Sequence, residues 1–560
     1  MTNGAAFVWR AMPAAPTCDF RSHLFYHGGK LMAEDLVFAR KASGLVRGLD
    51  MWDAFGAGLM TCQPIATLWL MVGIGLSLFP TGNLLISILI GAVTAGIGAP
   101  LVWGILSGSM PRAGGEYVYN SRILHPAIAL GAVFMNILAI FYWNWYIATW
   151  LGVPALQLFG QYMGWTGFTD WVASKAGLFI LGLIAVVVGY LSVAFSMKSY
   201  ALIQKIMLIP AIGGVLVLIG ALFLSSKGEF IGNWNAIATQ YNSLDYNAFI
   251  KAAGPLPTSW DWHGTLGAFS GVYALFVYNY AIAYLSGEVK RPDKSLLGAN
   301  ILAVWVPIVL GFLTVLGLYR IMAFNFLSAS AQASFGAGVP GYTAPYSPDY
   351  LTLTWIASGK SGIVAWAILL AFIAVIWLEI TIAILIVGRA FLAWGLDRMG
   401  PKWFTDVSPQ YASPIKNLTV AMAIFAVGVA VYVLWLQDSL SGLVGGGLQF
   451  VSVFLVTGIS ALLFPYRKKA RGIWESSPYR TWNILGIPLV TIGAVLYLMF
   501  ILTFLYFSFI DPTSRDLTGK NLIVFAVAWV AGLLWYFYWR RRSAKQGIDV
   551  SITFGELPPE

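Results

Sequence analysis

Apolar residues along this chain are grouped in long blocks that polar segments separate. A helix needs about 20 mostly apolar residues to cross a bilayer. Twelve blocks meet that length, and they predict membrane-spanning helices at residues 53–79, 83–107, 125–158, 173–195, 199–224, 265–286, 296–324, 362–393, 416–437, 447–466, 485–509 and 519–539. Several blocks are longer than a perpendicular crossing requires, which indicates tilted or interrupted helices.

The composition identifies the solvent around these helices as lipid. The chain is 59% hydrophobic and only 10% charged, whereas soluble domains carry about 25% charged residues. So few charges could not cover a water-facing surface. The predicted fold class is therefore all-α, a polytopic membrane protein with twelve transmembrane helices and no further domain.

The basic residues indicate the orientation of the chain. An even number of spans puts both termini on the same side, and 26 of the 33 Lys and Arg residues lie in loops and tails on that side. Basic loops stay in the cytoplasm. We therefore expect a multi-pass protein of the plasma membrane with both termini cytoplasmic. The net charge of +10 is then a topology signal, and nucleic acid is not an expected partner.

Motifs for covalent or metal chemistry are lacking. Two Cys and four His residues form neither a disulfide framework nor a metal-ligand pattern. No paired carboxylates or nucleophile–base constellation suggests an enzyme. The GxxxxGK[ST] phosphate loop of ATP-driven pumps is also missing. We expect no cofactor, no metal and no enzymatic activity.

The first 31 residues differ from the rest of the chain. They contain Cys18, His23 and His27, lack a long apolar core, and do not have the pattern of a signal peptide. A basic segment that leads directly into the first span follows Met32. One hypothesis is that translation begins at Met32; the alternative is a disordered tail. The mass of the native protein tests this.

Three polar stretches carry a family resemblance. They are PRAGGEYVYNSR at residues 111–122, SGEVKRPDKS at residues 286–295, and GRAFLAWGLDRMGPKWFTDVSPQYASP at residues 388–414. They follow the second, sixth and eighth spans, in that order. In sequence and in place these stretches resemble the amino acid–polyamine–organocation transporter superfamily, and the spacing holds from about residue 48 to 510.

The resemblance implies a five-plus-five inverted repeat with two added helices. The expected organisation is a cytoplasmic tail at 1–47, a first repeat at 48–224, an extracytoplasmic loop at 225–264, a second repeat at 265–466, two further helices within 467–540, and a C-terminal tail at 541–560. In such transporters the solute binds at midplane, where the first and sixth helices are broken.

The first span has a candidate break at Pro64. This residue is eleven positions into the span, or about 16 Å at 1.5 Å per residue, which is midplane depth. Thr61, Cys62 and Gln63 precede it and supply polar atoms for a solute. The alternative is a simple proline kink. Members of the superfamily typically have a Gly-Ser-Gly-type break here, so Gln63-Pro64-Ile65 puts their carboxylate contact in doubt.

The sixth span carries Tyr278, Asn279 and Tyr280 about 20 Å from its start. Asn279 is a candidate solute contact, and the two tyrosines could stack over the solute. Alternatively, these tyrosines only pack and snorkel.

The third span carries the sequence YWNWY. Helical spacing puts Tyr142 and Tyr146 on one face and Asn144 elsewhere. Tyr142 is therefore a candidate for an aromatic wall of the site, and an interfacial aromatic belt is the alternative.

Glu379 is the acid that lies well inside an apolar stretch, in the eighth span. A charge at this depth costs roughly 2.5–3.5 kcal/mol or more, so the carboxyl group should be neutral, paired or facing water. A proton could bind there from outside and leave inside, and Thr381 is a possible cation ligand nearby. Glu379 is thus the candidate coupling residue; substrate recognition and a structural bond are the alternatives.

Two mixed-charge clusters lie at cytoplasmic helix ends. One contains Glu288 with Lys290 and Arg291, and the other contains Asp397 with Arg398. They could form salt bridges in one conformation and release them in another, as a cytoplasmic gate would. The alternative is a pair of solvated turns.

These features together indicate a secondary transporter for an amino acid or a related small amine, coupled to protons or exchanging solutes, with sodium as another possible coupling ion. The alternative from a different class is a pseudo-transporter that acts as a solute sensor or membrane scaffold without net transport.

Overall fold

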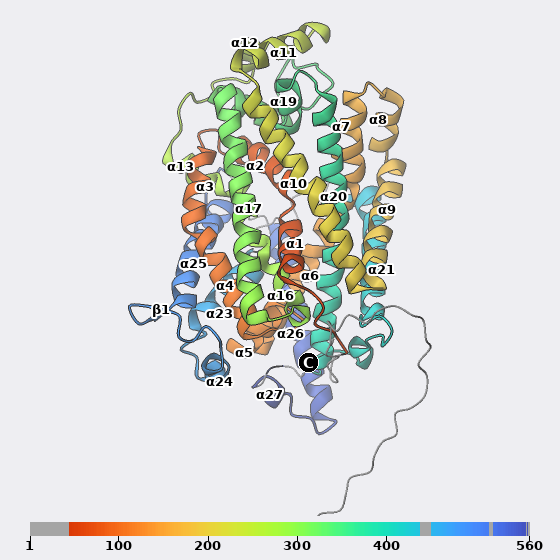
Figure 1. Ribbon diagram of the computed structural model, residues 1–560, viewed down its shortest axis with the longest axis vertical. Helices are drawn as coiled ribbons and strands as arrows, with labels where there is room; N and C mark the ends of the chain where they lie inside the picture. Colours follow the sequence, from red (N-terminus) through yellow and green to blue (C-terminus); the bar gives the residue numbers. More distant parts are fainter. Residues whose placement is uncertain (1–43, 437–449, 514–518, 556, 558–560) are drawn as a thin grey trace, which may run out of the picture. The chain divides into compact units, whose positions relative to one another are not determined.

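The computed structural model of the 560-residue chain describes residues 44–436, 450–513, 519–555 and 557. Cys18 and the hypothesis of a start at Met32 lie outside these residues. Figure 1 shows that long helices running side by side form the bulk of the described chain.

The predicted all-α membrane fold is confirmed. In the described residues, ten helices are long and apolar enough to cross a bilayer: Met51–Leu78, Leu84–Ser109, Pro126–Tyr162, Lys175–Ala194, Met197–Leu224, Pro292–Ile321, Gly362–Leu396, Ile415–Leu436, Leu489–Phe509 and Leu522–Ala544. Two bent pairs bring the number to twelve if each pair is one span. They are Trp262–Val272 with Ala274–Glu288, bent by 55°, and Val451–Leu463 with Lys468–Glu475, bent by 78°.

Besides the sixth span, five of these twelve units are subdivided: the first, second, third, ninth and tenth. The first consists of α1 (Met51–Cys62) and α2 (Pro64–Leu78), and the second of α3 (Leu84–Val93) and α4 (Ala95–Ser109). The third contains α6 (Pro126–Thr149), η1 (Leu151–Leu156) and α7 (Gln157–Tyr162). The ninth contains α21 (Ile415–Val431) and η5 (Tyr432–Leu436).

The remaining long helices are α9 (Lys175–Ala194), α10 (Met197–Leu224), α17 (Pro292–Ile321), α20 (Gly362–Leu396), α25 (Leu489–Phe509) and α26 (Gly519–Ala544). The tenth unit contains η6 (Phe450–Leu455), α23 (Val456–Leu463), η7 (Lys468–Ala470) and α24 (Arg471–Glu475). Shorter helices are α5 (Glu116–Ile123), α8 (Thr166–Ala173), η4 (Lys402–Thr405) and α27 (Val550–Thr553), and β1 (Asn483–Ile484) pairs antiparallel with β2 (Ile487–Pro488).

The first span breaks at the predicted proline. Gln63 has left-handed backbone angles, with φ 52° and ψ 66°, and separates α1 from α2. Pro64 causes this break because it has no N–H group to continue the helix and its ring disfavours helical angles at the residue before it. Two helix ends therefore meet inside the bundle.

The sixth span is interrupted more extensively. It is divided into α13 (Trp262–Gly267), α14 (Phe269–Val272), α15 (Ala274–Val277), η2 (Tyr278–Tyr280), α16 (Ala281–Leu285) and η3 (Ser286–Glu288). Both η2 and α16 pack against α1. The two interrupted spans thus lie next to each other.

The two long polar connections contain helices. Residues 225–264 include α11 (Lys227–Gln240) and α12 (Tyr246–Ala252), and residues 325–361 include α19 (Tyr350–Ala357) and most of α18 (Phe324–Phe335). The helix α18 packs against α2. In Figure 1 α11, α12 and α19 lie at one end of the bundle, opposite α5, α24 and α27.

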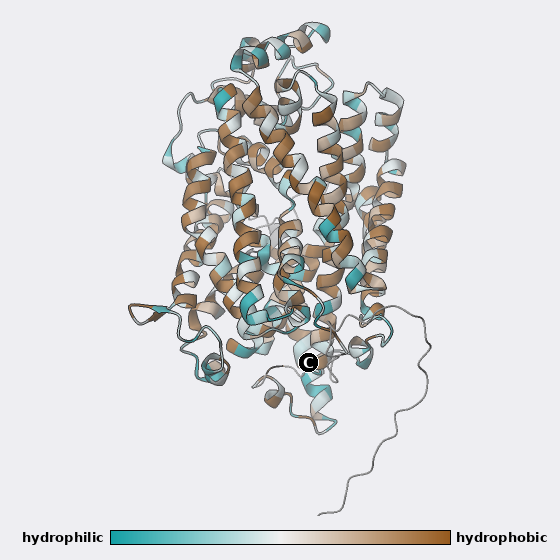
Figure 2. Ribbon diagram, in the orientation of Figure 1, coloured by the Kyte–Doolittle hydropathy of each residue, from teal (hydrophilic) through white to brown (hydrophobic). Residues whose placement is uncertain are grey.

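Hydrophobic residues make up most of the long helices (Figure 2), and many of them are exposed. Leu224 and Ile209 of α10 are 88% and 73% exposed, and Val427 of α21 is 65% exposed. Soluble proteins avoid large exposed apolar patches. A bilayer satisfies these side chains, so the surface agrees with the transmembrane fold.

The last span packs on the third one through glycines. A Cβ atom on Gly532 of α26 would lie 2.6 Å from the carbonyl oxygen of Leu130 and 2.7 Å from the Cα atom of Gly131, both in α6. Small residues let membrane helices approach this closely. Otherwise α26 is mainly lipid-facing, as expected for a peripheral helix: only 17% of its apolar window is buried.

Candidate functional site

A cavity of about 60 Å³ lies where the two interrupted spans meet α6 and α20. Its lining comes from both breaks and from the two helices that pack beside them. The lining residues are Thr61, Cys62, Gln63, Thr67, Leu70, Ile140, Trp143, Asn144, Ile147, Trp150, Tyr273, Ala274, Tyr278, Tyr280 and Glu379. A space of this size holds a few water molecules, since one needs at least about 10–15 Å³.

Most backbone polar groups at the first break form hydrogen bonds with groups of the same span. The N–H group of Gln63 donates to the carbonyl oxygens of Leu59 and Met60, and its own carbonyl accepts from the Thr67 N–H group at 2.8 Å. The Thr67 hydroxyl donates to the Cys62 carbonyl. The Cys62 thiol donates to the carbonyl of Ala274 at 3.3 Å, which ties the first break to the sixth span.

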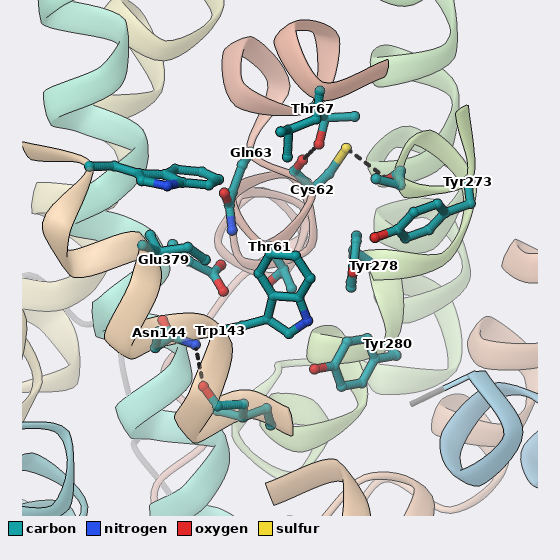
Figure 3. Close-up of a pocket in the computed structure, with 15 residues that line it drawn as sticks. Thr61, Cys62, Gln63, Thr67, Trp143, Asn144, Tyr273, Tyr278, Tyr280 and Glu379 are labelled. Atoms are coloured by element: carbon teal, nitrogen blue, oxygen red, sulfur yellow. Dashed lines mark hydrogen bonds between the residues drawn. The ribbon is translucent and has the colours of Figure 1, made fainter. Parts of the chain in front are cut away.

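Glu379 supplies the charge of the cavity. Its side chain is 7% exposed, and its Oε2 atom accepts no hydrogen bond from the described residues. The amide side chains of Gln63 and Asn144 interact with the carboxyl group. Figure 3 shows the carboxyl group between these two amides, pointing into the cavity. A buried carboxyl group with an unused oxygen is costly in a membrane, so it marks a candidate functional site.

Aromatic rings form the opposite wall (Figure 3). The ring of Tyr278 lies 6.1 Å from that of Tyr273 and 6.3 Å from that of Tyr280, measured between centroids. Trp143 of α6 also lines the cavity. The cavity therefore has a carboxyl group with two amides on one side and aromatic faces on the other.

Six of the predicted site residues line this cavity together. They are Thr61, Cys62, Gln63, Tyr278, Tyr280 and Glu379. The hydroxyl of Thr61 already donates to the carbonyl of Ala57 at 2.9 Å, so it offers only its lone pairs to a ligand.

The face of α6 that lines the cavity is not the one that carries Tyr142. Tyr142 does not line the cavity; it is buried and its ring packs against Tyr432, at 6.4 Å. Trp143 and Asn144 face the cavity in its place. Helical spacing separated the two faces correctly, but it did not say which one points inward.

Asn279 and Thr381 also lie outside the cavity lining. The Asn279 amide donates to Oδ1 of Asn300 in α17 at 2.7 Å, because the short η2 turn directs this side chain away from its tyrosine neighbours. The Thr381 hydroxyl donates to the Trp377 carbonyl of its own helix at 2.7 Å. Neither side chain is positioned as the solute or cation ligand that the sequence suggested.

Two buried ion pairs lie nearer the end of the bundle that holds α5. Arg122 of α5 donates from Nη1 and Nη2 to Asp397 after α20, both at 2.6 Å. Arg389 of α20 donates to Glu288 from Nε at 2.6 Å and from Nη2 at 3.1 Å. All four side chains are at most 1% exposed. We call these four residues the ion-pair cluster.

The sequence identified both acids of this cluster but not their partners. Lys290, Arg291 and Arg398, which are adjacent to the acids in sequence, have exposed side chains. Arg122 and Arg389 come instead from other segments, 275 and 101 residues away from their acids. Both arginines lie in the three stretches that resemble the transporter superfamily, and this position was the sequence feature that could have identified them.

Glu116 at the start of α5 was missed altogether. It is fully buried, and its Oε1 accepts from the Tyr284 hydroxyl at 2.6 Å and from the Asn136 amide at 2.7 Å. Burial raises the pKa of Glu116 from 4.5 to about 7, against the lowering effect of these hydrogen bonds. Gly115 permits this contact, since its φ is +54° and a Cβ atom there would lie 2.6 Å from the Tyr284 ring.

An aromatic cluster lies on the other side of the cavity. Trp69 of α2 contacts the cavity-lining Trp150 at 6.0 Å and Phe335 of α18 at 5.2 Å, between ring centroids. The cavity thus lies between this cluster and the ion-pair cluster.

Metal binding has no candidate within the part of the chain that the structure describes, because no group of three His, Cys, Asp or Glu side chains is close enough to hold an ion.

Comparison with known proteins adds a family match. The model of a family described as amino acid permease matches residues 49–532, from the start of α1 into α26. No curated protein sequence matches the chain significantly.

Proposed function

Since the chain belongs to the amino acid permease family, we propose that it is a secondary active transporter that moves a small amino acid or amine across the plasma membrane by alternating access. The observation that carries the proposal is the cavity at the two helix breaks, with the unused oxygen of Glu379 directed into it. Such broken helices form solute sites because backbone groups and polar side chains meet there inside the membrane.

The two clusters on either side of the cavity support alternating access. The ion-pair cluster closes one side, and the Trp69–Phe335 contact covers the other. Each connects segments from different parts of the chain, so opening either side requires the segments to separate. The expected inverted repeat, at 48–224 and 265–466, puts in each half one of the two spans whose breaks line the cavity.

Glu379 is the proposed coupling residue. An ionised carboxylate without a basic partner is unfavourable inside the bilayer. Binding of a proton or of a positively charged group removes that cost, so the occupancy of this carboxyl group links solute movement to proton movement. Lys205 of α10 pairs with Asp50 and Asp53 at 3.0 Å each and is not available for this role.

The orientation of the proposed transporter follows from charge. The ion-pair cluster lies at the end that carries most basic loop residues, and such loops remain in the cytoplasm. The cluster is thus a cytoplasmic gate, and both termini are cytoplasmic.

Reconstitution into liposomes tests the proposal. Purified protein is expected to exchange radiolabelled alanine, serine or 2-aminoethanol for the same unlabelled compound inside the vesicles. Glu229→Gln, an exposed substitution on α11, is the matched control and should behave as the unaltered protein. Binding of these compounds without any flux would contradict transport and favour a sensor.

A further inference from the structure

The cavity is lined by an acidic side chain but by no basic one. Glu379 carries the one carboxyl group among the 15 residues that line it, and none of them is Lys, Arg or His. The cation on the same helix, Arg389, is ten residues away, or about 15 Å along the helix axis. Arg389 is also bonded to Glu288. A solute carboxylate would therefore meet a like charge without any cation to balance it.

The first break offers little to a carboxylate. Pro64 has no N–H group, and the N–H groups of Gln63 and Thr67 are bonded within the break, which leaves those of Ile65 and Ala66 as the neutral backbone donors at the start of α2. The hydroxyls of Thr61 and Thr67 donate to main-chain carbonyls. Trp143 and Trp150 still offer indole N–H groups, but neutral donors do not compensate the charge of Glu379.

The unused acceptors suit a cation. Oε2 of Glu379 and Oδ1 of Asn144 are both buried and accept no hydrogen bond from described residues. An ammonium group has three donors and no acceptor. The faces of Tyr278, Tyr280 and Trp143 can attract the same charge through their π-electrons. Figure 3 shows these rings around the space into which Glu379 points.

We infer that the solute of this cavity is a small organic ammonium ion without a carboxylate, and that this ion and a proton compete for Glu379. The inference rests on the proposed transport through this cavity and narrows it. A carboxylate with neither ion bound is costly at this depth. The transporter therefore switches between access from outside and access from inside only when Glu379 holds an ammonium ion or a proton. Each cycle then moves one ammonium ion in one direction and one proton in the other, without net charge.

The groups that face Glu379 do not provide another strong competitor for the proton. Cys62 faces it from α1, and Tyr273, Tyr278 and Tyr280 face the cavity from the sixth span. From α6 come the neutral side chains of Trp143 and Asn144. The contacts of α20 with α9 and α10 involve Gly189, Ser192 and Gly214, which do not ionise.

Three matched pairs of probes test the substrate class. Each pair consists of an amine and the amino acid that carries an extra carboxylate: 2-aminoethanol with serine, isobutylamine with valine, and phenethylamine with phenylalanine. The full chain in liposomes is expected to bind the amine at least tenfold more tightly than the amino acid in at least one pair, measured by competition in counterflow. Tighter binding of the amino acid in all pairs, or no binding of any of the three amines, overturns the inference.

The direction of the proton gradient tests the competition. Vesicles that contain the protein and are acidic inside should accumulate the preferred amine faster than protein-free vesicles, into which the neutral amine diffuses unaided, and a potassium diffusion potential should not change this difference. Accumulation driven only by acid outside would show symport and overturn the exchange. Transport of amino acids in place of amines would leave the proposed function intact, whereas absence of flux for all six probes despite binding would refute the proposed function itself.

Glu379→Gln separates direct binding from a structural role. It should weaken amine competition at least tenfold and remove its pH dependence, while Glu379→Asp, which keeps the charge, should retain both in weaker form. Glu229→Gln is the control for an acid outside the cavity. Amine binding by Glu379→Gln with unaltered affinity and pH profile would overturn the inference.

Discussion

The cavity and the ion-pair cluster both bury carboxylates in the same helix bundle, but they treat them differently. In the ion-pair cluster each oxygen of Asp397 and Glu288 accepts a hydrogen bond from an arginine. In the cavity Oε2 of Glu379 accepts none. A fully paired carboxylate holds two segments together, whereas an incompletely paired one retains affinity for a ligand. In the proposed transport cycle, this difference distinguishes a gate from a binding site.

Removing one arginine of the ion-pair cluster should have the largest effect on stability. Arg122→Met leaves Asp397 buried without its partner, which typically costs about 3–5 kcal/mol. We expect a clear loss of thermal stability in detergent. Replacing both partners, Arg122→Met with Asp397→Leu, should recover most of the loss, because no charge then stays unpaired. Equal destabilisation by the single and double variants would contradict this account of the pair.

Removing the carboxylate of the cavity should affect transport and not thermal stability. Glu379→Gln removes a charge that has no basic partner, so thermal stability should stay equal or rise. Solute counterflow should nevertheless fall at least tenfold, equivalent to about 1.4 kcal/mol. A loss of stability similar to that of Arg122→Met would show that Glu379 is structural.

Glu116 is intermediate between these two cases, because its carboxyl group accepts hydrogen bonds, but from neutral partners. Burial raises its pKa to about 7, so its neutral form favours the folded arrangement. This contribution is fully present below the ordinary pKa of 4.5 and is lost as the pH rises through about 7. The unfolding temperature should therefore decrease between pH 6 and pH 8 more in the unaltered protein than in Glu116→Gln. Parallel pH profiles would exclude this role.

The smallest effect is expected at the exposed pair of the first span. Lys205 is 42% exposed; it contacts Asp50, which is 49% exposed, and the buried Asp53, which keeps its hydrogen bond from the Asp50 N–H group. Exposed ion pairs contribute about 0–1 kcal/mol. Lys205→Met should change stability by less than this amount and leave counterflow unaltered. A strong transport defect would indicate that Lys205 participates in coupling after all.

Sequence patterns predicted the spans well because hydrophobic length depends on local composition. The break at Pro64 was predictable for the same reason, since proline acts on its own helix. Glu379 was identified because a carboxyl group inside an apolar block is unusual at any rotation of the helix. These features depend on residues close together in the chain.

The remaining errors concern contacts between distant segments. The identity of the cavity-facing side of α6 depends on which helices surround it, and spacing alone selected Tyr142 where Asn144 and Trp143 line the cavity. The partners of Glu288 and Asp397 are likewise set by the packing of α5 and α20, so Arg389 and Arg122 could not be identified from the residues adjacent to the acids. Glu116 was missed because a polar loop gave no indication that its side chain is buried.

The glycine contact between α6 and α26 determines how much of the chain is needed for the cavity. Because Gly131 and Gly532 bring the two backbones together, the last span fills a groove on the helix that carries Asn144. A chain shortened before residue 519 would expose that groove to lipid tails, which match its shape less well than a helix does. The last span does not line the cavity, but it supports the helix that forms one of the cavity walls.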